Sequence, residues 1–580
     1  MEIAKNLQPA DVTIVLCGQA GQGIQTVETL LSNTFKLAGC SVFSTKEYMS
    51  RVRGGMNSTF VRVSDKPVSA FIDRIDILAC LDAGAADHLR SRIGPQTVVI
   101  GDKGTFGQAA ETAKNRFDIP FNTIAEQAGG KIYSNTVAAG AIIGLLGMDM
   151  EPVREVLRNI FAGKDEIIQT NIAALEKGYE AVRAVCRGID FKLKGAAQQA
   201  ASDHILVRGA QAVGLGAIGG GCNFISSYPM SPSTGVLVFL AQNAADFGIV
   251  AEQAEDEIAA VNMAIGAWYA GARAIAATSG GGFALMCEGI SLAGMLETPV
   301  VINLAQRPGP ATGLPTRTEQ GDLELALYAG HGEFPRILLA PGTLEEGFLL
   351  TAKAFNLADK FQVPVIILTD QYYMDSYYDS PAFDVDELKP QKHIIETAAD
   401  YRRYELTEDG ISPRGVPGFG KGMVCVDSDE HDQTGHITED LDLRVEMVDK
   451  RLQKLDMMRE CAVQPTLYGS ENYRNLVICW GSTVNIVREA VELTKSQDTA
   501  VLHFTQIFPL HSDAAMLICE AETSIVVEGN ATGQFAKLLL LETGIQVDHN
   551  VLKYDGISFA ADTLADQLLS IIGRRNHNEE

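Results

Sequence analysis

The sequence lacks closely spaced cysteines. Its 10 cysteines are scattered from Cys17 to Cys519, and no two of them form a Cys-x-x-Cys pair. Because such pairs are the usual spacing in iron–sulfur and zinc sites, we do not expect this chain to hold a cluster. Any redox cluster that works with it must come from another subunit.

Basic residues are also in short supply. The chain has 47 Lys and Arg against 73 Asp and Glu, which gives a formal net charge of −26. A surface this acidic repels the phosphates of nucleic acids and the headgroups of anionic membranes. We therefore expect neither nucleic acid nor a membrane surface as a partner.

Long hydrophobic runs are missing as well. An extended apolar stretch, residues 137–148, is too short to span a bilayer and predicts a buried helix. The N-terminus lacks the charged and apolar regions of a signal peptide. These features predict a cytoplasmic protein with no transmembrane segment.

The size and the order of elements predict an α/β fold. A chain of 580 residues with 46% hydrophobic residues is too long for one core and apolar enough to fill several. Short apolar strands alternate with helical stretches, as parallel sheets require. We expect three domains with mainly parallel sheets at residues 1–190, 206–390 and 471–580, a linker at 191–205 and a loop-rich connecting arm at 391–470.

A glycine-rich loop follows the first predicted strand. It reads Gly18-Gln-Ala-Gly21-Gln-Gly23 and departs from the strict dinucleotide-binding pattern. The next strand ends at Lys46 with no acidic residue to hold a ribose hydroxyl, which disfavours NAD. Lys46, Arg51 and Arg53 would suit a ligand with an extra phosphate, although a solvated basic edge explains them equally well.

Four polar turns interrupt the apolar middle of the chain. They are residues 228–234, 255–257, 278–282 and 306–313. A buried core does not need a carboxylate at the start of an alanine-rich helix, or an arginine directly after an apolar strand, unless something polar is held there. These turns predict half of an active site.

Glu257 stands at the start of the alanine-rich helix. The predicted inner face of that helix is an apolar stripe of Ile258, Val261, Ile265 and Trp268. A carboxylate buried beside this stripe would be a strong hydrogen-bond acceptor or proton donor. The alternative is that the charge only complements the helix dipole.

Arg307 follows the apolar strand 300–305 and precedes the rigid turn 308–310. This position is the carboxyl end of a strand, where ligands bind in open α/β sheets. A planar guanidinium there suits a carboxylate ligand. The alternative is a salt bridge to Glu319 or Asp322 in the loop that follows.

Two further turns give weaker signals. Ser231 and Thr234 lie in a turn stiffened by Pro229 and Pro232, which would hold their hydroxyls in place. The glycines of residues 278–282 bring the backbone close either to a ligand or to a neighbouring helix. Neither turn identifies its ligand.

The acidic loop at residues 427–440 contains His431 and His436 among several carboxylates. Its spacing matches no standard ligand pattern, so we predict a solvated loop and no metal site in this chain. His331 lies in a glycine turn downstream of Arg307. No role follows for it from the sequence.

Taken together, the four polar turns resemble the α subunit of 2-oxoacid:ferredoxin oxidoreductases. Further similar runs are residues 402–413, 429–432, 435–440 and 530–536. The resemblance covers essentially the whole chain. It implies a γ domain fused at residues 1–190, a pyrimidine-binding domain for thiamine diphosphate at 206–390 and a transketolase C-terminal-like domain at the end.

The resemblance also implies roles for residues. Glu257, Arg307 and Ser231 would be catalytic, with Glu257 bonding the cofactor's pyrimidine ring and Arg307 the 2-oxoacid carboxylate. The other implied contacts are Tyr228, Pro229, Ser279 and Gly280 for thiamine diphosphate, Ser231 and Thr312 for substrate, and Gly18, Gly21, Gly23, Lys46, Arg53 and Asn135 for coenzyme A. Ser231 stands where the family usually has threonine, and Gly281 replaces a frequent proline.

The chain has no Gly-Asp-Gly signature for Mg²⁺ and the diphosphate. The resemblance therefore implies a β subunit that carries Mg²⁺ and [4Fe–4S] clusters, with ferredoxin as electron acceptor and an (αβ)₂ assembly. The fused γ domain favours 2-oxoglutarate as substrate and coenzyme A as co-substrate. The alternatives are a nonoxidative thiamine-dependent decarboxylase and a noncatalytic nucleotide-binding scaffold.

Overall fold

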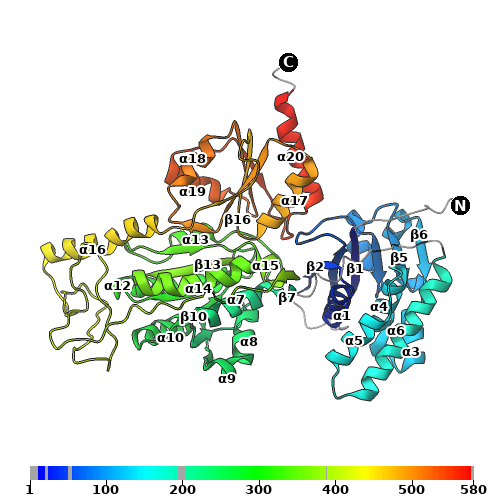
Figure 1. Ribbon diagram of the computed structural model, residues 1–580, viewed down its shortest axis with the longest axis horizontal. Coiled ribbons are helices and arrows are strands. Elements are labelled where there is room, and N and C mark those ends of the chain that lie inside the picture. Colours follow the sequence, from blue (N-terminus) through cyan, green and yellow to red (C-terminus); the bar gives the residue numbers. More distant parts are fainter. Residues whose placement is uncertain are drawn as a thin grey trace. The chain divides into compact units, whose positions relative to one another are not determined.

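A computed structural model describes residues 11–19, 24–49, 55–187, 189, 191, 193, 204–386 and 388–576. Helices pack on three β-sheets, so the expected α/β class is confirmed (Figure 1). The chain forms two compact units. Unit 1 contains residues 1–207, 376–382 and 560–563, and unit 2 contains the remainder.

Unit 1 contains an eight-stranded mixed sheet. Its strand order is β6 (Asn115–Asp118), β5 (Val98–Gly101), β4 (Ile77–Cys80), β1 (Asp11–Gln19), β3 (Met56–Ser64), β2 (Ser41–Glu47), β14 (Tyr377–Pro381) and β7 (His204–Arg208). Strands β1, β4, β5 and β6 pair in parallel, whereas β3 pairs antiparallel with both β1 and β2. The helices are α1 (Ile24–Leu37), α2 (Ala85–His88), α3 (Phe121–Ala128), α4 (Ser134–Leu145), α5 (Glu151–Ile160) and α6 (Asp165–Val185).

The apolar run at residues 137–148 forms most of α4, which is buried as expected. Two glycines let α4 and α6 approach each other closely. A Cβ atom on Gly140 would overlap the carbonyl oxygen of Leu175, and one on Gly178 would overlap that of Val137. Backbone therefore packs against backbone, which accounts for glycine at both positions.

Strand β14 brings a segment from the middle of the chain into unit 1. It pairs antiparallel with β2. The Asp379 carboxylate accepts hydrogen bonds from Ser41 Oγ at 2.8 Å and from the Val42 backbone N–H at 2.7 Å. This long-range pairing has no local sequence signal.

Unit 2 contains two sheets. The first has the order β18 (Gln506–Phe508), β12 (Ile337–Leu339), β13 (Pro364–Asp370), β11 (Val300–Gln306), β10 (Ala274–Thr278), β8 (Phe224–Ser227) and β9 (Val250–Gln253). All its pairings are parallel except that of β18 with β12. Its helices are α7 (Gly209–Gly219), α8 (Thr234–Gln242), α9 (Ala244–Phe247), α10 (Glu257–Tyr269), α11 (Gly280–Leu285), α12 (Cys287–Met295), α13 (Leu323–Leu327), α14 (Leu344–Phe361) and α15 (Gln371–Asp375).

The second sheet of unit 2 has the order β15 (Thr466–Gly469), β17 (Thr499–Phe504), β16 (Asn475–Trp480), β19 (Thr523–Glu528) and β20 (His549–Leu552). Helices α17 (Val484–Thr494), α18 (Asp513–Cys519), α19 (Gln534–Thr543) and α20 (Ala561–Asn576) accompany it. One continuous hydrophobic core joins it to the first sheet.

The connecting arm contains a long helix that the sequence did not predict, α16 (Leu441–Glu460). Its buried positions include Lys450, Arg451 and Lys454, so the helix shows no apolar stripe. Lys450 Nζ lies 2.6 Å from a Glu297 carboxylate oxygen, and Lys454 pairs with the same carboxylate. Ion pairs with Glu297, and not a stripe of apolar side chains, hold this helix against the rest of unit 2.

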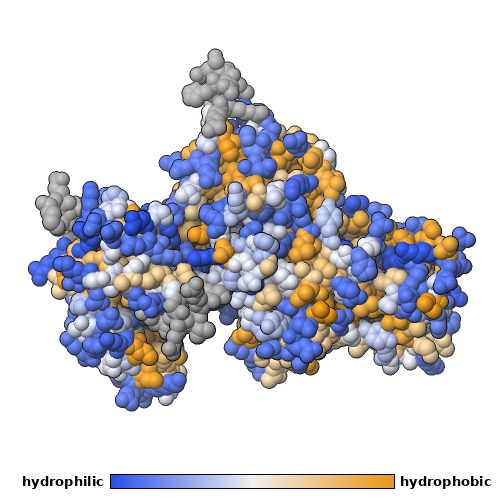
Figure 2. All heavy atoms as spheres, turned by 180° about the vertical axis from the view of Figure 1, so that it is seen from behind, coloured by the Kyte–Doolittle hydropathy of each residue, from blue (hydrophilic) through white to orange (hydrophobic). Residues whose placement is uncertain are grey.

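The face seen in Figure 2 is largely hydrophilic, with smaller hydrophobic patches between the polar areas. No helix within the described parts of the chain is both long enough and apolar enough to cross a membrane.

Candidate functional site

The four polar turns meet at one edge of the first sheet of unit 2. Strands β9, β8, β10 and β11 are parallel neighbours in that order. Tyr228 follows β8, Glu257 opens the helix after β9, Ser279 follows β10 and Arg307 follows β11. Because parallel strands end at the same edge, the topology gathers these residues at the place where open α/β sheets bind ligands.

Glu257 is buried at the start of α10. Only 3% of its surface is exposed, and within the described residues its Oε1 atom has no hydrogen-bond partner. The cap of α10 is instead the Asp256 side chain, which accepts a hydrogen bond from the Ala259 backbone N–H at 2.8 Å. The helix-dipole alternative does not explain a buried, unpaired oxygen, since such an atom is costly unless a ligand group satisfies it.

The predicted inner face of α10 is correct at three of its four positions. Val261, Ile265 and Trp268 are buried, but Ile258 is half exposed. Ile258 follows Glu257 directly, and consecutive helical side chains point in different directions. The buried face of α10 contains Glu257 but leaves Ile258 at its edge.

Gly282 in α11 lies against the Glu257 carboxylate. A Cβ atom on this glycine would lie 2.5 Å from Glu257 Oε1 and would also overlap Thr278 Oγ1. The neighbouring Gly281 has ample room, with its nearest neighbour, the Ala311 carbonyl oxygen, at 3.7 Å. The glycine turn therefore makes space for the carboxylate specifically at Gly282.

Arg307 connects two of the polar turns. Its Nη1 donates a hydrogen bond to the Ser231 backbone carbonyl at 2.7 Å. In the described part of the chain it forms no ion pair with Glu319 or Asp322, so the predicted salt-bridge alternative is wrong. Burial lowers the pKa of Arg307, while the Asp322 and Glu257 carboxylates oppose that shift. The guanidinium thus keeps donors for another anion.

The loop after Arg307 is held by the C-terminal part of unit 2. Gln320 Nε2 donates to the Trp480 carbonyl at 2.9 Å, and its Oε1 accepts from the Gly529 N–H at 2.8 Å. Asn530 Nδ2 donates to the Gln320 carbonyl at 3.2 Å. Sequence reasoning missed this contact, although the run 530–536 was a signal that could have pointed to it.

Asp322 is a second site carboxylate whose place the sequence did not predict. Its Oδ2 atom is buried and has no hydrogen-bond partner within the described residues. A Cβ atom on Gly280 would lie 2.5 Å from its Oδ1. Burial, together with the negative charge of Glu319, raises the pKa of Asp322 to about 7, against the opposing charge of Arg307.

The remaining predicted residues of this site differ in their surroundings. Ser279 is fully buried, and its Oγ has no partner within the described residues, so it can still bond a ligand. Tyr228 is 41% exposed at the end of β8. Thr312 is exposed in the Arg307 loop. No contact of the described chain brings Thr312 to the Arg307 guanidinium.

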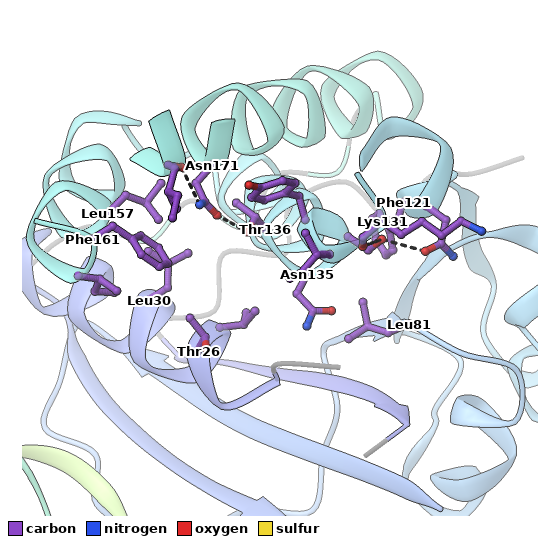
Figure 3. A pocket seen from close by; sticks show the side chains of 17 residues that line it. Thr26, Leu30, Leu81, Phe121, Lys131, Asn135, Thr136, Leu157, Phe161 and Asn171 are labelled. Atoms are coloured by element: carbon purple, nitrogen blue, oxygen red, sulfur yellow. Dashed lines mark hydrogen bonds between the residues drawn. The ribbon is translucent and has the colours of Figure 1, made fainter. Parts of the chain in front are cut away.

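Unit 1 contains a cavity of about 690 Å³ (Figure 3). The predicted residue Asn135 lies on its wall, and its carboxamide points into the space between Thr26 and Leu81 (Figure 3). Polar and apolar groups both line the cavity, namely Thr26, Asn122, Lys131, Ser134, Asn135, Thr136 and Asn171 with Leu30, Leu81, Phe121, Leu157 and Phe161. Such a lining suits a long ligand with polar and apolar parts.

Gly18 and Lys46 are not among the residues that line this cavity. Gly18 is near the end of β1, and Lys46, in β2, lies 5.5 Å from the Tyr48 ring centre. Gly21, Gly23, Arg51 and Arg53 lie outside the described residues, so the structure says nothing about their role.

The acidic loop at residues 427–440 is internally bonded. His431 is fully buried, packs against the tilted Tyr404 ring with 3.8 Å between ring centres and bonds the Asp429 carbonyl through Nδ1 at 2.9 Å. Asp432 Oδ1 accepts hydrogen bonds from Thr434. His331 is exposed and lines a cavity of about 400 Å³ that has both polar and apolar walls. In the described residues no group of three His, Cys, Asp or Glu side chains is arranged to hold a metal ion.

Two protein-family models match this chain. Residues 13–181 match the family model "Pyruvate ferredoxin/flavodoxin oxidoreductase". Residues 215–450 match "Pyruvate flavodoxin/ferredoxin oxidoreductase, thiamine diP-bdg". The second match contains all four polar turns of the candidate site.

Relatives match over nearly the whole chain. The 2-oxoacid:ferredoxin oxidoreductase subunit alpha of a Sulfolobus species is 32% identical over 96% of both chains. The 2-oxoglutarate oxidoreductase subunit KorA of Mycobacterium tuberculosis is 26% identical over 96% of this chain and 90% of its own.

A solved structure has the same fold from end to end. It is the 2-oxoglutarate:ferredoxin oxidoreductase from Magnetococcus marinus with 2-oxoglutarate, coenzyme A and succinyl-CoA bound. It superposes with a TM-score of 0.91 at 30% identity and covers 97% of this chain and 99% of its own. The chain therefore belongs to the family of 2-oxoacid:ferredoxin oxidoreductase alpha subunits.

Proposed function

We propose that this chain, with a β subunit, catalyses the coenzyme A-dependent oxidative decarboxylation of a 2-oxoacid, with 2-oxoglutarate preferred. The 2-oxoacid and the thiol of coenzyme A would give acyl-CoA, CO₂, one proton and two electrons, and the electrons would leave for ferredoxin. The observation that carries the proposal is the buried Glu257 Oε1 atom, which has no hydrogen-bond partner within the described residues and lies beside Gly282 at a sheet edge that also holds Arg307.

The residues around Glu257 fit thiamine diphosphate. The unpaired Oε1 would accept a hydrogen bond from the cofactor's pyrimidine ring, and the absence of a Cβ at Gly282 leaves the carboxylate uncovered. Ser279 Oγ, which is also buried without a partner in the described part of the chain, and the backbone at Gly280 would hold the same ring, with Tyr228 and Pro229 at its edge. When bound, thiamine diphosphate supplies the carbon nucleophile for 2-oxoacid decarboxylation.

Arg307 would bind the substrate carboxylate. The Ser231 carbonyl orients its guanidinium through the bond to Nη1, and no carboxylate of the described chain occupies it as an ion-pair partner. A charge-assisted hydrogen bond of this kind contributes about 1.5–3 kcal/mol. The Ser231 hydroxyl and Thr312 remain candidate substrate contacts.

Coenzyme A would bind in the cavity of unit 1. Asn135 offers both a hydrogen-bond donor and an acceptor on the cavity wall, and the apolar lining suits the thiol-bearing arm of the molecule. Gly18, Gly21, Gly23, Lys46 and Arg53 are candidates for its phosphates because of their residue types.

A β subunit would complete the site with Mg²⁺, the diphosphate contacts and iron–sulfur clusters. Exposed apolar side chains surround the candidate site, namely Tyr228, Ile258, Leu285 and Leu314. Covering such side chains is a common source of association energy. We propose that they contact the β subunit in an (αβ)₂ assembly.

The test is kinetic. The copurified complex would be given pyruvate, 2-oxoglutarate or branched-chain 2-oxoacids, and coenzyme A-dependent reduction of a viologen dye would be followed. We expect the highest kcat/KM with 2-oxoglutarate and no dye reduction without coenzyme A. Aldehyde release without an acceptor would favour a nonoxidative decarboxylase, and full activity of the isolated chain would refute the shared site.

A further inference from the structure

The C-terminal sheet of unit 2 has the strand order of a ligand-binding sheet. Strand β17 lies on one side of β16 and β19 on the other, and both pair with β16 in parallel. The strand order therefore reverses between β16 and β19. Open α/β sheets bind ligands at such a reversal, outside the carboxyl ends of the strands. In this sheet those ends are Trp480 and Glu528.

The side chain of Gln320 occupies this position. Its Nε2 donates a hydrogen bond to the Trp480 carbonyl at 2.9 Å, and its Oε1 accepts one from the Gly529 N–H at 2.8 Å. Only 2% of Gln320 is exposed. A buried amide is costly unless its polar atoms are bonded, and here both ends of the amide are bonded. A glutamine of the chain itself thus stands where a sheet of this kind binds an external ligand.

Two glycines fit the sheet to this amide. A Cβ atom on Gly481 would lie 3.3 Å from Gln320 Nε2, and a Cβ atom on Gly529 would lie 3.3 Å from Gln320 Oε1. Both separations are tighter than ordinary van der Waals contacts, so a side chain at either position would press on the amide. Gly481 also has a φ of 56°, which glycine adopts readily. The ends of β16 and β19 are therefore shaped around the Gln320 side chain.

The backbone around Gln320 is bonded to the same sheet. The Gln320 N–H donates to the Gly529 carbonyl at 2.6 Å, and Asn530 Nδ2 donates to the Gln320 carbonyl at 3.2 Å. One residue later, the Gly321 carbonyl accepts a hydrogen bond from Gln534 Nε2 at 2.9 Å. Side chain and backbone together anchor this segment to the residues that follow β19.

The anchored segment is the returning limb of the loop that begins at Arg307. The Asp322 N–H donates to Gln306 Oε1 at 3.0 Å, so the two ends of the loop meet at the end of β11. Gln320 precedes Asp322 by two residues and ties this limb to the C-terminal sheet. At the other end of the loop, Arg307 Nη1 donates to the Ser231 carbonyl at 2.7 Å. The loop that carries the arginine is therefore held between two sheets.

We propose that Gln320 is a positioning residue for 2-oxoacid binding. By filling the ligand position of the C-terminal sheet, it fixes the loop so that the Arg307 guanidinium meets the substrate carboxylate. The proposal rests on the proposed role of Arg307. Gln320 acts through the loop and does not itself touch the substrate. The C-terminal sheet thereby gains a function in substrate binding through an internal contact.

The first test is the kinetics of the copurified complex with Gln320→Met, which keeps the length of the side chain and removes both of its hydrogen bonds. We expect the KM for 2-oxoglutarate to rise about tenfold, because a small displacement of a binding group is costly. The KM for coenzyme A should stay unchanged.

Ser524→Ala is the matched control for stability. It removes a buried hydrogen bond to Asp548 Oδ2 at the opposite end of β19, and it should lower Tm without changing either KM. If Gln320→Met likewise lowers Tm and leaves the KM for 2-oxoglutarate unchanged, the glutamine is only structural and the proposal is overturned.

A double variant tests whether the glutamine acts through the arginine. We expect Gln320→Met combined with Arg307→Met to lose no more kcat/KM than Arg307→Met alone, since residues that act through one contact are not additive. Losses that add would overturn the proposal.

Gly529→Ala protects the test against misfolding of Gln320→Met. It leaves Gln320 in place, crowds its Oε1 and should raise the same KM. If Arg307→Met raises this KM but neither Gln320→Met nor Gly529→Ala does, only the role of Gln320 fails. If Arg307→Met itself leaves the KM unchanged, the proposed substrate site fails, and the Gln320 proposal fails with it. The two failures are therefore distinguishable.

Discussion

Gly282 lies so close to Glu257 that a Cβ atom on the glycine would be 2.5 Å from the Oε1 of the glutamate. The glycine lies in α11, which follows β10, and the glutamate opens α10, which follows β9. The two residues meet because β8, which pairs with both strands, brings the two carboxyl ends to one edge of the sheet. Glu257 Oε1 is therefore a buried acceptor that has no partner within the described residues, and we propose that an aminopyrimidine ring bonds it.

Gly282→Ala should displace the Glu257 carboxylate and reduce kcat by at least about tenfold, because a carboxylate moved by about 1 Å no longer meets its ligand well. Steady-state kinetics of the complex would measure the loss. Gly281→Ala is the matched control, since its nearest neighbour lies at 3.7 Å, and it should retain activity. Equal effects of the two substitutions would contradict this geometry.

Glu257→Gln should reduce kcat by roughly 100- to 10,000-fold, the range expected when a group in proton transfer is lost. The amide keeps the size of the side chain, so the complex should still assemble on a sizing column. Glu255→Gln removes an exposed carboxylate two residues earlier and serves as control. Wild-type turnover in Glu257→Gln would support a noncatalytic scaffold.

Arg307→Met should lower kcat/KM for 2-oxoacids by about 10- to 100-fold, corresponding to the loss of one charge-assisted hydrogen bond. A rise in KM should account for much of the effect if the arginine binds the ground-state carboxylate. Initial rates over a range of 2-oxoglutarate concentrations would separate KM from kcat. Arg402→Met, at an exposed arginine of the connecting arm, should change neither constant.

Asn135→Leu should raise the KM for coenzyme A by roughly fivefold or more, because the cavity would lose one hydrogen-bonding amide. The KM for the 2-oxoacid should remain unchanged. Gln108→Leu, at an exposed position of the same unit, provides the control. An unchanged KM for coenzyme A in Asn135→Leu would argue that the cavity serves another ligand.

Glu297→Gln should destabilise unit 2 by about 3–5 kcal/mol, the range for breaking a buried ion pair. The substitution would leave the buried ammonium groups of Lys450 and Lys454 without their shared counter-charge. Thermal and urea unfolding would measure the change. Glu288→Gln, at an exposed position in α12, should cost little. An equal loss in both variants would show that the cluster contributes no specific stability.

Local residue patterns were sufficient to predict the fold class and some of the candidate site residues. The alternation of apolar strands with helices predicted the α/β class, and the apolar run at 137–148 predicted a buried helix. Glu257 and Arg307 were recognisable because a charged residue beside a long apolar segment needs a reason to be there. The scattered cysteines pointed to a partner for any cluster.

Contacts between distant residues could not be predicted in this way. The α16 helix escaped notice because its buried face is cationic and its counter-charge, Glu297, lies in another part of the chain. Strand β14 joins unit 1 through Asp379 although its neighbours in sequence belong to unit 2. Local periodicity carries no information about such pairings.

The amino-acid sequence by itself determined the fold class, the acidic surface and the presence of four polar turns, because these depend on composition and on local spacing. The meeting of the turns at one sheet edge depends on strand order, which arises only when the chain folds. Within the described residues, the same folding leaves Glu257 Oε1 unpaired beside Gly282, keeps Arg307 out of an ion pair and places Asp322 against Gly280. Burial and neighbouring charges, which exist only in the folded chain, turn these ordinary side chains into a candidate site.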